Sequence, residues 1–161
     1  MMDEIRSIWR GIKNIFIWMP VIYKDRWYDH YYFFKILEFK LNLMSEMFEK
    51  EGHGVNSPKD AKRMKMCAEL CKRFSEDNYS EEMYKAHEEK WGKLKMDFKD
   101  DPDRPGFGSL KMTHSKCLTE EDKTMEAIEN KKIWDHEEKM KQQDINKLFD
   151  TMKKYIRGWW D

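Results

Sequence analysis

Hydrophobic residues recur at spacings of three and four over the first part of the chain. Between Asp3 and Met19 the apolar positions are Ile5, Ile8, Trp9, Ile12, Ile15, Phe16 and Met19. This spacing places them on one side of a helix and predicts an amphipathic α-helix. The basic residues of this segment fall on its other faces, at Arg6, Arg10 and Lys13. We expect Pro20 to end or kink the helix, because proline has no amide hydrogen to donate.

Two further helices are predicted in the first half of the chain. The second runs from Arg26 to Lys50, with Asp25 as its N-cap. Its first turns are dense in aromatic rings, so we expect it to be central to the fold. The third starts at a capping Ser57 followed by proline and ends near Asn78. Its predicted apolar face consists of Ala61, Met64, Cys67, Ala68, Leu70, Cys71 and Phe74.

The second half of the chain has a short helix, a loop and a long helix. A helix is expected from Ser80 until Gly92 ends it. Residues 93–99 alternate between polar and apolar, and residues 109–113 do so weakly, so they form a candidate two-stranded ribbon near residues 93–113. We expect the remainder of residues 100–118 to form an irregular loop. The last helix extends from Thr119 to Ile156, with Asp122 completing an approximate capping box.

These elements predict a single all-α domain over residues 1–161, a bundle of four to five helices. The length fits one domain. Charged residues make up 39% of the chain, but the aromatic content of 14% supplies the large apolar surfaces that a disordered chain lacks. Lys plus Arg and Asp plus Glu are equal at 31 each, which argues against a uniformly basic surface for extended nucleic acid.

Several features point to the cytoplasm. Three cysteines are a poor disulfide framework, and acidic residues stand where a signal peptide would be basic. The longest apolar run, Ile15 to Tyr23, is far shorter than the roughly 20 residues of a transmembrane helix.

Cysteine and histidine offer one candidate metal site. Cys67 and Cys71 lie one helical turn apart, and His114 and Cys117 form a His-x-x-Cys pair. Together they have the composition of a Cys₃His zinc site. Neither pair has the Cys-x-x-Cys form of a zinc knuckle, so we favour the alternative that the helical cysteines are buried in the core. No metal and no other cofactor is therefore expected.

Catalytic motifs are missing from the sequence. There is no Gly-x-Ser-x-Gly elbow and no His-Glu-x-x-His pair, and Pro105 to Ser109 lacks the lysine of a phosphate-binding loop. We expect a protein that is not an enzyme and has no catalytic residues.

Residues 24–32 interleave aromatic rings with cations. Such a mixture suits stacking on a nucleobase and pairing with phosphate. The alternative is a core helix whose charged side chains reach out to solvent, and we favour it for most of these rings.

The first helix also has two interpretations. Its apolar face and cations fit a helix lying on a membrane surface, whereas packing on a protein core is the commoner use of such a helix and the one we favour.

Three stretches, Lys13–Tyr32, Lys90–Gly92 and Asp144–Phe149 with Trp159–Asp161, resemble a family of small uncharacterised proteins of tailed bacteriophages. The resemblance covers most of the chain apart from the central loop and carries no functional residue. It implies an accessory protein expressed in the cytoplasm of an infected bacterium.

In that setting the first functional hypothesis is counter-defence, by sequestering a small anionic nucleotide that serves as an immune signal. The expected ligand-binding residues are Arg26, Tyr28, His30, Tyr32 and Trp91. Rings would stack on the base and the guanidinium would hold phosphate. An alternative is an inhibitor that binds and occludes a host protein, and a third is attachment to a membrane surface through the first helix.

The ends of the chain suggest self-association. Ile17 and Trp18 lie off the main stripe of the first helix, and Trp159 and Trp160 stand beside the last residue. Large apolar side chains are costly to leave in water, and a small bundle has limited area to cover them. We therefore expect a homodimer that pairs through its terminal helices.

Overall fold

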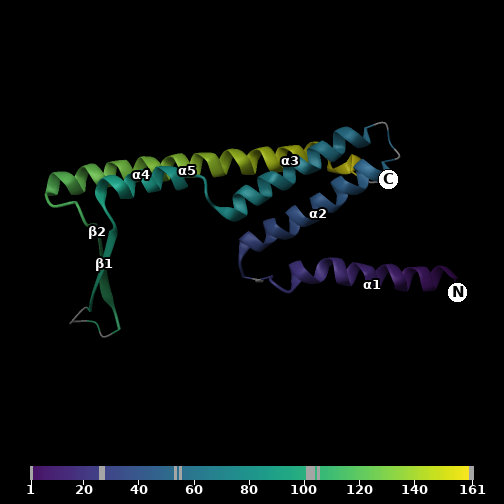
Figure 1. The fold of residues 1–161 in the computed structure, drawn as a ribbon, viewed down its shortest axis with the longest axis horizontal. Helices are drawn as coiled ribbons and strands as arrows, with labels where there is room; N and C mark the ends of the chain where they lie inside the picture. The colour runs from purple at the N-terminus through teal and green to yellow at the C-terminus, as the bar shows by residue number, and fades with distance from the viewer. Residues whose placement is uncertain are drawn as a thin grey trace. The chain divides into compact units, whose positions relative to one another are not determined.

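The computed structural model describes residues 2–25, 28–52, 54, 56–100, 104 and 106–159. The elements follow one another as α1 (Met2–Ile22), α2 (His30–Glu51), α3 (Ser57–Glu76), α4 (Glu81–Trp91), β1 (Leu94–Asp100), β2 (Gly108–His114), α5 (Glu120–Tyr155) and the 3₁₀ turn η1 (Ile156–Gly158) (Figure 1). The predicted all-α fold with a short two-stranded ribbon is therefore confirmed.

The contacts within the chain divide it into two compact units. Residues 1–77 and 143–161 form the first, called here the helical unit, and residues 78–142 form the second, the ribbon unit. Helix α5 contributes its first part to the ribbon unit and its last part to the helical unit.

The core of the helical unit lies between α2, α3 and the end of α5. Its buried side chains are Phe34, Leu41, Phe48, Ala61, Met64, Cys67, Ala68, Leu70, Cys71, Leu148 and Trp159. The predicted apolar face of α3 is thus confirmed, with Phe74 packed at its margin. One buried polar group links α2 to α3, because Ser45 Oγ donates a 3.0 Å hydrogen bond to the carbonyl of Ala61.

Two helix ends differ from the sequence prediction. Helix α2 begins at His30 and not at Arg26, because Asp29 is its N-cap and accepts a 2.9 Å hydrogen bond from the Tyr31 amide. Pro20 does not end α1, which continues to Ile22. Pro20 removes one amide donor near the end of the helix, and the turn continues beyond it because the Tyr23 amide still donates to the carbonyl of Met19 at 2.9 Å.

The start of α3 also differs by one residue. Asn56 occupies the N-cap position and Ser57 is the first helical residue, with Pro58 in the first turn. The Ser57 hydroxyl instead accepts a 3.0 Å hydrogen bond from the Gly54 amide. It therefore closes the turn before the helix.

The ribbon unit is built from α4, the hairpin and the first part of α5. Strands β1 and β2 are antiparallel, with Met96 opposite Met112 and Phe98 opposite Leu110. Gly92 ends α4 with a φ of 80°, in the left-handed region that favours glycine. The predicted start of α5 is confirmed by reciprocal bonds, since the Asp122 carboxylate accepts from the Thr119 amide at 2.9 Å and the Thr119 hydroxyl accepts from the Asp122 amide at 3.1 Å.

Candidate functional site

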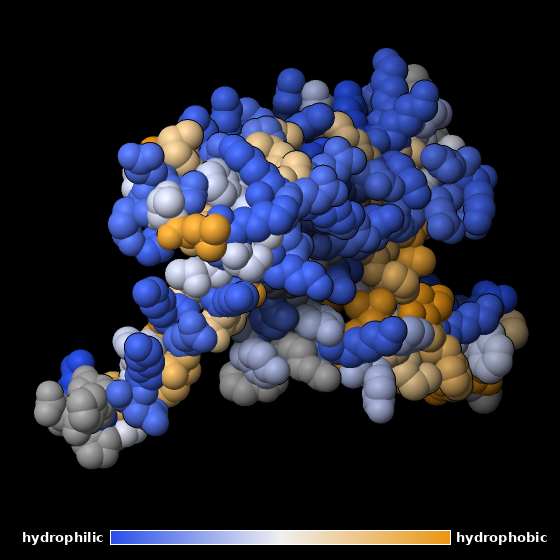
Figure 2. All heavy atoms as spheres, turned by 60° about the vertical axis from the view of Figure 1, so that its left-hand side comes forward, coloured by the Kyte–Doolittle hydropathy of each residue, from blue (hydrophilic) through white to orange (hydrophobic). Residues whose placement is uncertain are grey.

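Helix α1 presents an apolar surface that stays exposed among the residues that the structure describes. Eight of its side chains share one side of the helix and are each between 40% and 65% exposed: Ile5, Ile8, Trp9, Ile12, Ile15, Phe16, Met19 and Ile22. At 3.6 residues per turn they cover an arc of about 140°. We call this set the apolar arc. In Figure 2, hydrophobic atoms lie exposed along this helix, at the lower right of the view.

The opposite side of α1 contacts the rest of the helical unit. Trp18 and Val21 are the partly buried residues of this helix. The Trp18 ring packs edge-on against Phe39 of α2, with 5.2 Å between ring centroids, and Lys40 Nζ lies 6.0 Å from the same ring. This contact points the apolar arc away from α2.

Three cations lie on the polar side of α1. Lys13 and Arg6 follow the edge of the apolar arc that Trp9 forms, and Lys13 Nζ lies 5.8 Å from the Trp9 ring. At 3.6 residues per turn, Arg10 lies nearly opposite the centre of the arc. The acids of the helix are Asp3 and Glu4, both in its first turn. Helix α1 therefore combines a wide apolar face with a polar side that carries three cations.

A cavity of about 440 Å³ lies between α1, α2 and α3. Three cationic side chains line it, at Lys24, Lys35 and Lys72, together with the Tyr32 ring. Glu38 and Glu76 also line it, and partial burial raises the pKa of the Glu38 carboxyl despite the nearby Lys72. The cavity thus holds one more cation than it has carboxylates.

The residues expected to bind a nucleotide are placed in different surroundings. Tyr32 lines the cavity described above, while Tyr28 and His30 are exposed near the start of α2. Trp91 belongs to the ribbon unit and is buried at the end of α4. Arg26 lies outside the described residues. Of this set, the helical unit holds three described members and the ribbon unit one.

The four residues of the candidate Cys₃His site are divided in the same way. Cys67 and Cys71 are buried in the core of the helical unit, where burial raises their pKa values to about 11 and about 12. His114 and Cys117 belong to the ribbon unit. There His114 lies beside His87 and Glu126, which the sequence analysis did not single out.

The chain matches no protein-family model, and no curated protein or solved structure matches it. Within the described residues, no helix has the length and apolar content needed to cross a membrane. Function is therefore inferred from the residues of this chain.

Proposed function

We propose that the protein attaches to anionic membrane surfaces through α1, which lies in the plane of the interface with its apolar arc among the lipid acyl chains. The observation that carries this proposal is the exposure of all eight side chains of the apolar arc, on a helix with no buried residue. The arc is too narrow and the helix too polar elsewhere for a membrane-spanning role.

Physical chemistry favours insertion. Moving apolar surface out of water stabilises by about 25 cal/mol per Å². Ile, Phe and Trp side chains provide that surface along the whole length of α1. Lys13 and Arg6, on the polar side next to the arc, can reach the headgroups, and each cation near an anionic surface contributes about 1 kcal/mol. Trp9 offers the amphipathic ring that suits the boundary between water and lipid.

A lipid surface fits α1 better than a second copy of the same helix. In an antiparallel symmetric pair of α1 helices that pack arc on arc, Lys13 and Arg6 would approach their own equivalents along one edge. Asp3 lies 3.9 Å from Arg6 and offsets part of its charge, but Lys13 is more than two turns from either acid of the helix. Anionic headgroups would supply negative charge at Lys13.

The resemblance to bacteriophage proteins suggests which membrane the apolar arc would bind. It implies that the membrane belongs to an infected bacterium and that the protein acts on its cytoplasmic side. Attachment would concentrate the protein where it can act on membrane-associated host components.

Vesicle flotation tests the proposal. The full chain should float with vesicles that contain one-third phosphatidylglycerol, bind pure phosphatidylcholine less, and bind less at high salt. Ile12→Glu places a charge at the centre of the apolar arc and should abolish flotation. Ser7→Glu adds the same charge on the far side of α1 and should retain most of it. Arg6→Gln with Arg10→Gln should weaken binding to anionic vesicles only.

Three outcomes contradict membrane attachment. In the first, the wild type fails to float with anionic vesicles. In the second, Ile12→Glu floats as well as Ser7→Glu. In the third, the wild type binds no vesicles, and light scattering shows a dimer that Ile12→Glu converts to a monomer. The last outcome assigns the arc to a second copy. Because α1 contributes no buried side chain, these variants should leave the circular dichroism of the chain unchanged.

A second candidate function is binding of a small anionic ligand, and the cavity between α1, α2 and α3 favours it. Lys24, Lys35 and Lys72 offer cations for phosphate, and Tyr32 offers a ring for a base. Lys35 Nζ already lies 5.6 Å from the Tyr32 ring. This is the nucleotide-sequestering hypothesis, with the site moved from the exposed rings to the cavity.

A thermal-shift series tests the cavity. Cyclic dinucleotides and ADP-ribose should raise the melting temperature of the wild type, and Lys35→Ala or Lys72→Ala should remove that rise. Lys59→Ala removes an exposed cation at the start of α3, away from the cavity lining, and should leave it intact. If no nucleotide shifts the wild type, or if Lys59→Ala has the same effect as Lys35→Ala, the cavity is not the site.

A further inference from the structure

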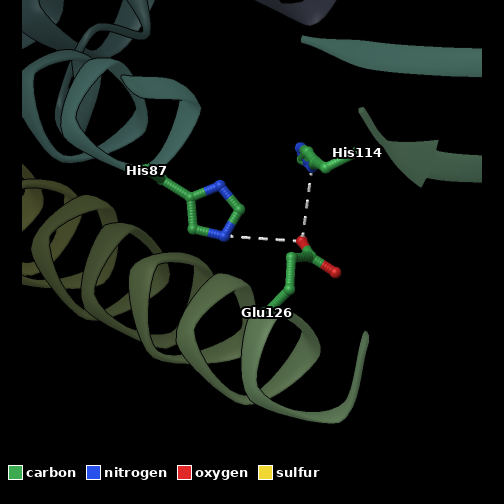
Figure 3. A group of neighbouring side chains, drawn as sticks. All are labelled: His87, His114 and Glu126. Atoms are coloured by element: carbon green, nitrogen blue, oxygen red, sulfur yellow. Dashed lines mark ion pairs between the residues drawn. The ribbon is translucent and has the colours of Figure 1, made fainter. Parts of the chain in front are cut away.

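Three side chains from different elements of the ribbon unit meet at one point. His87 comes from α4, His114 is the last residue of β2, and Glu126 comes from the second turn of α5 (Figure 3). His87 Nε2 lies 3.4 Å from Glu126 Oε1, and His114 Nδ1 lies 3.7 Å from the same oxygen. One ligand atom from each residue falls within 4.8 Å of the other two.

The two imidazole nitrogens are buried and lack hydrogen-bond partners among the described residues. The His87 and His114 side chains are only 5% and 11% exposed. A buried nitrogen without a partner is destabilising, so a native structure rarely keeps two of them side by side. Glu126 Oε1 is the acceptor that faces both nitrogens, but neither contact has hydrogen-bond geometry.

From this geometry we propose that His87, His114 and Glu126 bind a divalent transition metal ion of the zinc class. One ion between the three atoms would satisfy both imidazole nitrogens and the carboxylate at once. Tetrahedral zinc, with bonds of about 2.0–2.2 Å, holds its ligand atoms about 3.3–3.6 Å apart. The observed 3.4 and 3.7 Å separations from Glu126 are close to this range, and the two imidazole nitrogens, which lie within 4.8 Å of each other, would move closer together around the ion.

The ligand types select the metal. Two imidazoles and one carboxylate suit zinc and its neighbours, whereas calcium and magnesium prefer oxygen ligands alone. The set supplies three protein ligands, which leaves one tetrahedral position open. A cavity of about 480 Å³ adjoins the cluster, and His87, His114 and Glu126 are part of its lining. Water or a small ligand can therefore reach the fourth position.

The surrounding contacts hold the three elements in place without using the ligand atoms. On α4 and α5, Glu129 accepts hydrogen bonds from Lys90 Nζ at 2.6 Å and from Trp91 Nε1 at 2.8 Å, one turn beyond the cluster. At the end of the hairpin, the Cys117 amide donates to the carbonyl of His114 at 3.1 Å. The site is thus built before the ion arrives, which favours affinity.

The proposal is tested by metal titration of the full chain after treatment with a chelator, using Zn²⁺ in competition with a chromophoric chelator. The wild type should bind one Zn²⁺ per chain with micromolar or tighter affinity. His87→Ala and Glu126→Gln should each weaken binding at least tenfold. His136→Ala removes an exposed histidine elsewhere on α5 and should have no effect.

Glu126→Gln keeps the size of the side chain and one of its acceptor oxygens but removes the negative charge, so it remains informative if His87→Ala fails to fold. Co²⁺ provides a second measurement, because the visible spectrum of the wild type should show tetrahedral coordination without thiolate charge transfer. Equal Zn²⁺ affinity in the wild type and Glu126→Gln would overturn the proposal. So would an effect of His136→Ala as large as that of His87→Ala, which would indicate adventitious surface binding.

Discussion

Trp91 Nε1 donates a 2.8 Å hydrogen bond to Glu129 Oε2 and thereby joins α4 to α5 within the ribbon unit. The other carboxylate oxygen of Glu129 accepts from Lys90 Nζ at 2.6 Å. The Trp91 side chain is buried, so the indole that the sequence suggested for stacking on a ligand packs inside the unit. We therefore expect Trp91 and Glu129 to stabilise the ribbon unit.

Substitution of Trp91 should separate packing from hydrogen bonding. Trp91→Ala should lower the free energy of unfolding by about 3–5 kcal/mol, as for other buried aromatic residues. Trp91→Phe retains most of the apolar contact and should cost less, although Glu129 then loses a donor. Denaturant titration followed by circular dichroism measures both. Equal losses for the two variants would mean that the ring contributes little beyond its indole N–H.

The Glu129 carboxylate should make the ribbon unit sensitive to acid. Hydrogen bonds from Lys90 and Trp91 lower the pKa of Glu129 below its ordinary value of 4.5. A group whose pKa is lower in the folded state contributes stability above its unfolded pKa, and this contribution is lost as the pH falls through the folded value. Stability should therefore decline below about pH 4.5, and Glu129→Gln should make the decline shallower. If the free energy of unfolding falls as steeply below pH 4.5 in Glu129→Gln as in the wild type, this assignment is wrong.

Most of the fold could be predicted because local signals agree with the tertiary contacts. The start of α5 is one example, since Thr119 and Asp122 form their capping box from residues three apart. The sequence alone predicts the start of α2 too early, because Asp25 and Asp29 are both acids a short way before aromatic residues. The hydrogen bond from the Tyr31 amide to the Asp29 carboxylate identifies Asp29 as the N-cap. The division into two units could not be seen, because α5 continues through the boundary with an unbroken helical pattern.

The candidate sites were harder to predict for a physical reason. His87, His114 and Glu126 are separated along the chain and come from three elements, so no spacing rule brings them together. His114 was singled out only through its neighbour Cys117. The amphipathic pattern of α1 was visible in the sequence, but packing on a core and lying on a membrane produce the same pattern. The structure adds that Ile12 and its neighbours are exposed and do not pack in the core of the helical unit.

The three cysteines should react at different rates. Burial raises the pKa of Cys67 to about 11 and that of Cys71 to about 12, and both side chains are buried in the core. Cys117 is partly exposed in the ribbon unit. At pH 8 a disulfide reagent should modify one thiol in the native protein, and Cys117→Ser should remove that reaction. Rapid modification of two or more thiols without denaturant would contradict the buried positions.

The same thiols should affect stability in alkali. Their pKa values are higher in the folded than in the unfolded chain, whose ordinary value is 9.0. Their contribution is therefore complete below about pH 9 and is lost as the pH rises toward 11 and 12. Cys71→Ala should reduce the slope of unfolding free energy against pH in that window, at the expense of a lower value at neutral pH. A steeper slope in the variant would contradict the raised pKa of Cys71.

Trp159 gives the sharpest comparison with Trp91. It is 3% exposed and belongs to the core of the helical unit, but its Nε1 has no hydrogen-bond partner among the described residues. Trp159→Phe therefore removes volume without removing a hydrogen bond, and should cost about 1–2 kcal/mol for the space left behind. Trp91→Phe should cost more than Trp159→Phe, because it loses a hydrogen bond as well. If denaturant titration shows a larger loss of unfolding free energy for Trp159→Phe than for Trp91→Phe, this comparison is wrong.

Burial of Trp159 within its own unit also bears on self-association. The homodimer expected from the sequence stays a prediction, and it rested partly on this tryptophan needing a cover from a second chain. Since Trp159 packs in the core cluster that contains Leu148 of α5, deletion of residues 158–161 should destabilise the helical unit. The deletion should leave the oligomeric state unchanged, as measured by light scattering at micromolar concentration. A wild-type dimer that becomes a stable monomer on deletion would show that the C-terminal segment serves the interface instead.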